Sequence, residues 1–234
     1  MFCLFLIVTV FMARLSIYSL TVTNVRLADH TSYIIELLQR TVDIAQKYNW
    51  SKLKLDDIVM NIDEEVMNKT VRGTVEFTNG FVVSMQSMDL IQSTVQQAWL
   101  YDRNTNITRL ELRSTLRMQD VAIGYDVIAK MDHDEFHNTG VIVHPLIHFP
   151  ITLIRDLFTD ELSSTGSTTL FTHRNGVKFV PENTVTQIIS VLFQWNSTFS
   201  SFNRWATEIF APTVLELAKT EHKIPIFCYD CPIV

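Results

Sequence analysis

The stretch VRGTVEFTNGFVVSMQSM, from Val71 to Met88, decides the fold because it contains two conflicting signals. Apolar side chains alternate with polar ones, which is typical of a strand with one dry face and one wet face. In the middle stands Asn79-Gly80, a dipeptide that strongly favours a tight β-hairpin turn. The alternation predicts one continuous strand, whereas the dipeptide predicts a reversal of the chain.

The positions of the apolar residues favour the continuous strand. A two-residue turn would place Phe77 opposite Val82 and Val75 opposite Ser84, and this pairing scatters apolar side chains over both faces. A straight strand keeps one apolar set on one face, namely Val71, Val75, Phe77, Phe81, Val83 and Met85. We therefore expect one long strand that is bent or bulged at Asn79-Gly80, with the hairpin as the alternative.

A second alternating stretch covers Arg109–Met131. Its apolar residues occupy even positions up to Met118 and odd positions from Val121 onward. Either a hairpin at Gln119-Asp120 or a single bulge would produce this change of parity. Shorter strands are expected at residues 140–143, 148–158 and 168–180, separated by turns at residues 163–166 and 175–176.

Helical periodicity appears on both sides of these strands. Residues 25–48 carry one apolar stripe, and a broader aromatic stripe begins near Pro181 and continues to Phe210. The poor helix-forming run at Asn196 predicts a local break, and Pro212 predicts a kink or a restart. The sequence therefore predicts an α+β fold, in which a long curved antiparallel sheet wraps around an N-terminal helix and a long C-terminal helix.

Bulk composition excludes several classes of protein. The chain has 234 residues, is 47% hydrophobic and carries a formal charge of −6. It is long and apolar enough to bury a core, and it has no basic footprint for nucleic acid. The charge also argues against strong attraction to anionic membrane surfaces. We expect no nucleic-acid partner.

The N-terminal residues predict secretion. The run MFCLFLIVTVFM is too short to span a bilayer and fits the apolar part of a signal peptide, with an uncleaved anchor or a buried helix as the alternative. We expect a signal peptide at residues 1–19, a single domain at residues 20–222 and a C-terminal tail at residues 223–234. The protein would be extracellular, without integral membrane association.

Sequons and cysteines are consistent with an oxidising compartment. Four N-x-S/T sequons are candidate glycosylation sites, at Asn49, Asn68, Asn106 and Asn196. Cys228 and Cys231 stand three residues apart near the end of the chain, and a small disulfide loop is favoured over a redox pair or half a metal site.

Catalytic motifs are missing from the sequence. It contains no G-x-S-x-G, P-loop, G-x-G-x-x-G or H-E-x-x-H pattern. The nearest approach is His133 and His137 in HDEFH, but four residues along a strand span roughly 13 Å, too far for one metal ion. His144 and His148 are interpreted as turn and half-buried positions without an orienting acid. We expect no enzyme activity, cofactor or metal.

Three segments resemble a known family: GTVEFTN at Gly73–Asn79, LRMQDVAIGYDVIAK at Leu116–Lys130 and IFAPTVLEL at Ile209–Leu217. Over residues 25–219 the chain resembles the mite group 7 allergens and their arthropod relatives, of the tubular lipid-binding superfamily that includes the takeout, juvenile-hormone-binding and bactericidal/permeability-increasing proteins. Gly80 departs from the family pattern, and so does the missing N-terminal cysteine pair of takeout-like members. The resemblance implies a super-roll fold with a cavity for a hydrophobic small molecule or lipid.

Parity and helical spacing select the candidate lining of that cavity. On the sheet these residues are Phe77, Leu112, Leu116, Ile123, Tyr125 and Val127, and on the last helix they are Ile188, Leu192, Phe202, Trp205 and Ile209. The main alternative is an extracellular protein-interaction module with a filled core and a protein partner. A metal-assisted hydrolase at His133 and His137 is a third hypothesis.

Overall fold

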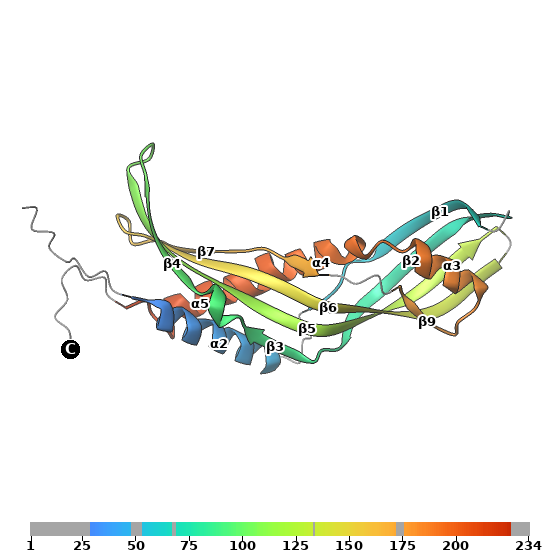
Figure 1. Cartoon of the computed structure of the whole chain (residues 1–234), viewed down its shortest axis with the longest axis horizontal. Coiled ribbons are helices and arrows are strands. Elements are labelled where there is room, and N and C mark those ends of the chain that lie inside the picture. The colour runs from blue at the N-terminus through green and yellow to red at the C-terminus, as the bar shows by residue number, and fades with distance from the viewer. Residues whose placement is uncertain (1–28, 48–52, 67–68, 133, 172–175, 226–234) are drawn as a thin grey trace, which may run out of the picture. The chain divides into compact units, whose positions relative to one another are not determined.

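One antiparallel sheet organises the computed structural model, which describes residues 29–47, 53–66, 69–132, 134–171 and 176–225 (Figure 1). Five strands follow one another across it, in the order β1 (Ile58–Val66), β2 (Lys69–Ser84), β5 (Ile107–Met131), β6 (Asp134–Asp156) and β7 (Leu162–Gly166). The short strands β3 (Ser87–Leu90) and β4 (Gln96–Asp102) pair with β5, and β8 (Thr169–Phe171) and β9 (Lys178–Val180) pair with β6. Together with the helices this confirms the predicted α+β fold class.

The opening stretch forms one strand as far as Ser84, as the apolar pattern predicted, and its last two residues, Ser87 and Met88, begin β3. β2 runs from Lys69 to Ser84, and Asn79 has a left-handed backbone with φ of 53°. The pairing of β2 with β5 shifts between Thr78 and Phe81. The bend is therefore confirmed, and the hairpin alternative is wrong.

The bend also corrects the predicted face of the residues beyond it. Phe77 is fully buried, but Phe81 and Val83 are each 51% exposed. The irregular residue Asn79 interrupts the alternation, so that Gly80 takes the inward position. A Cβ at Gly80 would stand 2.4 Å from the Tyr125 ring, which explains why glycine fits there.

A hairpin does not cause the change from even to odd apolar positions in the second stretch. β5 continues from Ile107 to Met131, and its register with β6 is the same before and after Asp120, which has φ of 47°. The buried face changes in both strands at this point, from Met118 to Val121 in β5 and from His144 to Ile147 in β6. Both strands therefore kink together without an extra residue.

Three strand and turn assignments need correction. The strand expected at residues 168–180 is instead two short strands, β8 and β9, which pair with different parts of β6. Residues 140–143 and 148–158 belong to one strand, β6, apart from the last two residues, because the pairing with β5 keeps one register on both sides of Pro145 although the buried face changes there. The turn expected at residues 163–166 is instead strand β7, which pairs with residues 151–155 of β6. Serine and threonine at these positions occupy an edge strand where half of the side chains face solvent.

Helices flank the sheet in sequence, as predicted, but the second helical region is interrupted. The N-terminal helix is α2 (Thr31–Lys47), and Ile34, Leu37 and Leu38 on its apolar face are fully buried. A short 3₁₀ turn, η1 (Gln92–Thr94), joins β3 to β4. The C-terminal region comprises α3 (Thr184–Leu192), η2 (Trp195–Thr198), α4 (Phe199–Arg204), the π-helical η3 (Trp205–Phe210) and α5 (Ala211–Lys219).

The break in the C-terminal region lies slightly earlier than expected. Phe193 and Gln194 have extended backbones, and the chain becomes helical again at η2. Pro212 stands in the first turn of α5 directly after the π-helical turn, and the backbone stays helical from Phe199 to Lys219, so the helix changes type before Pro212 without the restart that was one of the two expected outcomes. α3 is thus separated from the remaining helices by an extended connection.

Gly166 sets how closely β7 approaches the C-terminal helices. A Cβ there would lie 2.4 Å from the backbone oxygen of Ala206, which is too close for either atom to remain in place. We expect Gly166→Ala to lower the free energy of unfolding by about 2 kcal/mol through overpacking. Chemical denaturation beside Thr165→Ala, an exposed neighbour, measures this effect; equal stability of the two variants would contradict the close contact.

Candidate ligand-binding site

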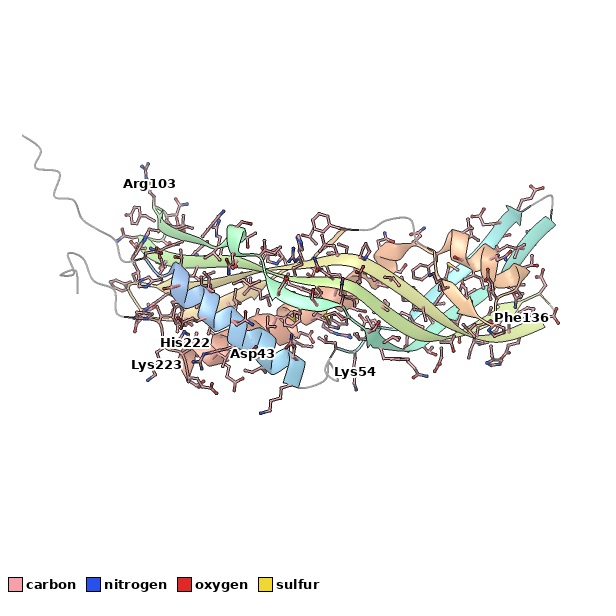
Figure 2. All side chains as sticks on the ribbon, turned by 60° about the horizontal axis from the view of Figure 1, so that its bottom comes forward. Asp43, Lys54, Arg103, Phe136, His222 and Lys223 are labelled. Carbon is pink, nitrogen blue, oxygen red and sulfur yellow. The ribbon has the colours of Figure 1, made fainter. Side chains whose placement is uncertain are left out.

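The two ends of the sheet have different helical cover. Near the start of β5, α2 and α5 pack against each other, α2 against β3 and β5, and α5 against β6 and β7. α3 lies at the other end, beside β9 (Figure 1). Figure 2 shows the same separation, with Phe136 at the α3 end and Asp43 of α2 toward the opposite end. Different helices therefore cover the inner residues at the two ends.

We call the region under α3 the α3 site. Its sheet wall consists of side chains that are at least nine-tenths buried and almost all apolar: Ile62, Val75, Phe77, Val127, Ala129, Asn138, Val177 and Phe179. From the helix, Thr186 and Ile189 are fully buried, whereas Ile188 and Leu192 are half-buried. Most of this wall is apolar surface that α3 helps to cover.

Local sequence defines where α3 begins and ends. The Asn183 side chain accepts a hydrogen bond from the Thr186 N–H at 2.9 Å, and the Asn183 N–H donates to the Thr186 hydroxyl at 2.8 Å, a capping box. At the other end the extended Phe193 packs its ring against Phe77, with centroids 5.1 Å apart. α3 is therefore a nine-residue helix with a defined cap and a non-helical connection behind it.

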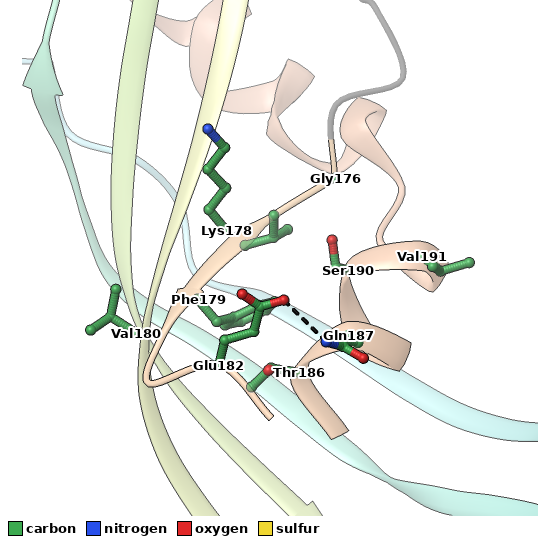
Figure 3. A pocket seen from close by; sticks show the side chains of 10 residues that line it. Gly176, Lys178, Phe179, Val180, Glu182, Thr186, Gln187, Ser190 and Val191 are labelled. Carbon is green, nitrogen blue, oxygen red and sulfur yellow. Dashed lines mark hydrogen bonds between the residues drawn. The ribbon is translucent and has the colours of Figure 1, made fainter. Parts of the chain in front are cut away.

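Hollows lie on two sides of this helix. The larger, of about 850 Å³, lies between α3 and β9 (Figure 3) and is lined by Gly176, Val177, Lys178, Phe179, Val180, Glu182, Thr186, Gln187, Ser190 and Val191. The smaller, of about 350 Å³, lies between β1 and the end of α3 and is lined by residues 58–62, Glu64, residues 192–194 and Ser197. α3 thus borders open space on both sides.

The larger hollow combines an apolar floor with a polar rim. Val177, Phe179 and Thr186 are buried, and the Thr186 hydroxyl already donates to the Asn183 carbonyl oxygen at 2.8 Å. At the rim, Gln187 Nε2 donates to Glu182 Oε1 at 3.2 Å, as the dashed line in Figure 3 shows. Small-molecule sites are typically apolar concavities with a small number of polar groups. The floor of this hollow matches that description, whereas its rim also contributes Lys178, Glu182, Gln187 and Ser190.

The structure divides the predicted lining residues between the two ends. Phe77, Tyr125 and Val127 meet in the α3 half, where the Phe77 and Tyr125 rings pack edge to face with centroids 5.9 Å apart. Leu112 and Leu116 lie toward the α2 and α5 end, and fifteen residues of strand, roughly 50 Å, separate Leu112 from Val127. These residues therefore do not surround one compact ligand.

The remaining predicted residues lie in β5 (Ile123), α3 (Ile188 and Leu192), α4 (Phe202) and η3 (Trp205 and Ile209). Ile123, Phe202 and Trp205 are fully buried, and the Phe202 and Trp205 rings lie 4.7 Å apart. Ile188, Leu192 and Ile209 are half-buried. Within the predicted set, Phe77, Tyr125, Val127, Ile188 and Leu192 belong to the α3 half.

β9 and the residue before it supply two lining residues that the sequence did not single out. Phe179 belongs to β9, which has only three residues and is too short for alternation to distinguish from a loop, and Val177 directly precedes this strand. The capping box Asn183-x-x-Thr186 was the signal that could have located the start of α3. It would have separated α3 from the helices that follow.

A polar cluster fixes the middle of the chain and explains Tyr125. Arg204 forms an ion pair with Asp56, the Asp56 N–H donates to Ser201 Oγ at 2.9 Å, and Trp205 Nε1 donates to the Lys54 carbonyl oxygen at 2.8 Å. Burial raises the pKa of Tyr125, and the charges of Asp56 and Asp57 raise it further. Tyr125 is therefore protonated at neutral pH and serves packing.

The structure places the candidate histidines that it describes in different surroundings. His144, predicted at a turn, is instead buried within β6, because it continues the alternation of the buried residues 138, 140 and 142. His148 is half-buried, as predicted, and His137 is exposed beside Glu135, with 2.9 Å between Nε2 and Oε1. His133 lies outside the described residues, which contain no group of three or more His, Cys, Asp or Glu able to hold a metal ion.

Several sequence predictions fall outside the described residues. These are the signal peptide at residues 1–19, the sequons at Asn49 and Asn68 and the pair Cys228 and Cys231. Asn106 and Asn196 are described, and both are exposed. No helix in the described part of the chain is long and apolar enough to cross a bilayer.

Comparisons with known proteins give little further information. No family model matches the chain, and no curated protein matches it. One solved structure that aligns with it is described as "Crystal structure of lipopolysaccharide binding protein", with a TM-score of 0.40 and 9% sequence identity. The alignment covers 79% of this chain and 38% of that chain, so the protein spans well under half the length of that structure. The resemblance to group 7 allergens stays a prediction.

Proposed function

We propose that this chain is a secreted, glycosylated, non-enzymatic protein that binds hydrophobic or lipid-like molecules in the α3 site. One observation carries the proposal: a largely apolar wall of the sheet is covered by a single nine-residue helix that borders hollows of about 850 and 350 Å³. The sequons and the apolar N-terminal run support secretion.

The energetics of apolar burial are sufficient for useful affinity. Removing roughly 400 Å² of ligand surface from water gains about 10 kcal/mol at 25 cal/mol per Å². The loss of translational and rotational freedom offsets a part of this, which leaves an affinity in the micromolar range. The rim residues Lys178 and Glu182 are exposed and need not contact an apolar ligand.

α3 is suited to act as the movable cover of this site. Its connections are the short segment after β9 and the extended residues Phe193 and Gln194. The elements that pack most closely on the strands include α2, α5 and η3 but not α3. Displacing α3 would therefore disturb fewer contacts than displacing α2 or α5.

Binding is testable with delipidated protein. We expect the protein to take up a fluorescent fatty acid or a terpenoid with a Kd in the micromolar range, seen by titration and as a one-to-one complex in native mass spectrometry. Protein denatured and held in guanidinium serves as the control for non-specific partitioning. Native protein that takes up no fatty acid, terpenoid or bacterial lipid would refute the proposal.

A second candidate function is an extracellular protein-interaction module. Phe81 and Val83 are each 51% exposed, and both side chains lie within 3.5 Å of the Cβ position at Gly124, so they form a small apolar patch. Such a patch on a strand face is a common feature of interaction surfaces. This candidate predicts the opposite titration result, because the interior would have no room for a ligand.

A further inference from the structure

A hollow of about 420 Å³ lies on the outer face of the sheet. Its lining includes one residue from each of four neighbouring strands, and these residues pair with one another in a row: Thr78 of β2, Asp126 of β5, Thr139 of β6 and Val180 of β9. Their neighbours along the strands, Phe77, Val127 and Phe179, are buried. Because successive side chains of a strand point to opposite faces, the row points away from the interior covered by α3.

Hydrogen bonds around this hollow leave acceptor oxygens without partners. Asn79 Nδ2 donates to Asp126 Oδ2 at 2.9 Å, and the Thr78 hydroxyl donates to the Asp126 carbonyl oxygen at 3.4 Å. Asn79 Oδ1 and Asp126 Oδ1 have no hydrogen-bond partner among the described residues, and neither has the exposed Thr139 hydroxyl. The hollow therefore offers three acceptor oxygens, one of which belongs to a carboxylate.

The described part of the chain does not balance the charge of Asp126. Lys130 lies on the same face of β5 but pairs with Glu76, with 2.9 Å between Nζ and Oε1. His137 borders the hollow, and its Nε2 lies 2.9 Å from Glu135 Oε1. No ion pair within the described residues includes Asp126. Its carboxylate is thus available to a positively charged ligand.

An ammonium group fits this arrangement, because it carries one positive charge, three hydrogen-bond donors and no acceptor. Ile128 and Val180 also border the hollow and offer apolar surface to the hydrocarbon part of the same molecule. The volume lies within the range of small-molecule sites. We propose that this hollow, which we call the Asp126 site, binds a small organic ammonium ion whose nitrogen donates to Asp126, Asn79 and Thr139.

Other ligand classes match the Asp126 site less well. A calcium ion takes about six to eight oxygen ligands, whereas Asp126 is the only carboxylate among the described lining residues. An anion would be repelled by this carboxylate. The inference does not depend on the proposed lipid binding, since Asp126, Asn79 and Thr139 line neither of the hollows beside α3.

Two probes of similar shape, 2-phenylethylamine and 2-phenylethanol, test the role of the positive charge by NMR titration of the ¹⁵N-labelled protein. At neutral pH the amine is protonated, and we expect it to bind about tenfold more tightly than the alcohol and to lose affinity as salt is added. The backbone signals that move should belong to residues 78–79, 126–128 and 137–139. Equal affinities, no binding of the amine, or shifts confined to residues 176–193 would overturn the proposal.

A charge-neutralising variant with a matched control locates the site. Asp126→Asn removes the charge and keeps an oxygen that can accept from Asn79, so the fold is expected to be unchanged. This variant should weaken binding of the amine about tenfold and leave binding of the alcohol unchanged. Asp63→Asn removes a carboxylate on the same face that already pairs with Arg72 at 2.7 Å, and it should change neither affinity. An unaltered amine affinity in Asp126→Asn, or an equal loss in both variants, would contradict the Asp126 site.

Discussion

A disulfide between residues 176 and 190 is expected to slow ligand uptake about tenfold or more, because it fixes the cover of the α3 site. Gly176 precedes β9, and Ser190 lies in α3. A Cβ at Gly176 would stand 3.4 Å from the Cβ of Ser190, and disulfides join Cβ atoms about 3.5 to 4.5 Å apart. The double variant Gly176→Cys with Ser190→Cys therefore needs only a small adjustment of the backbone.

The bridge acts on the part of α3 that borders the larger hollow. Gly176 and Ser190 both line this hollow, and they face each other in Figure 3. Joining them prevents α3 from moving away from β9, whereas the rest of the sheet is unaffected. A ligand that enters between α3 and β9 must then wait for reduction of the bond.

Stopped-flow uptake of a fluorescent fatty acid measures this effect in a background where Cys228 and Cys231 are replaced by serine. The oxidised double variant is compared with the same protein after dithiothreitol and with the single variant Ser190→Cys. We expect slow uptake only in the oxidised double variant, and recovery on reduction. Equal rates before and after reduction, with the bridge verified by mass, would show that α3 is not the cover.

The second large effect is a loss of stability in acid caused by His144. Its ring is 1% exposed, lies 3.2 Å from the Thr198 hydroxyl and packs edge to face on Phe202. Burial lowers the pKa of His144 from 6.5 to about 4. Between these values the unfolded chain binds a proton that the folded chain does not, so stability falls as the pH drops from about 6.5 to 4.

This one residue should reduce the free energy of unfolding by about 3 kcal/mol across that range. Denaturation of wild type and His144→Gln at several pH values between 4 and 7 isolates the contribution, because other groups titrate equally in both proteins. We expect the difference in stability between the two proteins to shrink or reverse toward pH 4. Parallel pH curves would contradict the burial of a neutral His144.

Much of the sheet could be predicted from alternation alone, because every second residue of a half-buried strand lies on the inner face and is apolar. Arg109–Met131 showed its inner residues on both sides of the kink at Asp120. The outcome at Asn79-Gly80 was harder to predict, since the left-handed Asn79 interrupts the alternation and exposes Phe81. The backbone conformation of Asn79 therefore determined which face of the sheet the following residues occupy.

The break before η2 depends on tertiary contact and was only approximately predicted. Asn196 and the polar residues after it suggested the break, but the extended residues are Phe193 and Gln194. Nothing in the local sequence makes Phe193 a helix breaker. Its ring packs on Phe77, more than a hundred residues earlier in the chain, and helical periodicity cannot predict such a long-range contact.

The candidate site was predicted residue by residue but not as a group. Alternation identifies which face a side chain occupies, and it correctly buried Phe77, Leu112 and Val127. It does not say which part of a 25-residue strand lies under which helix.

Photolabelling tests the location of the ligand most directly. A long-chain ketone carrying a diazirine is bound to delipidated protein and irradiated, and the labelled peptides are identified by mass spectrometry. The account predicts labels in residues 134–142, 176–180 and 184–193, and competition by unlabelled 2-tridecanone. Labels confined to α2, α5 or the strand around Phe81, or no competed label at all, would contradict a binding site under α3.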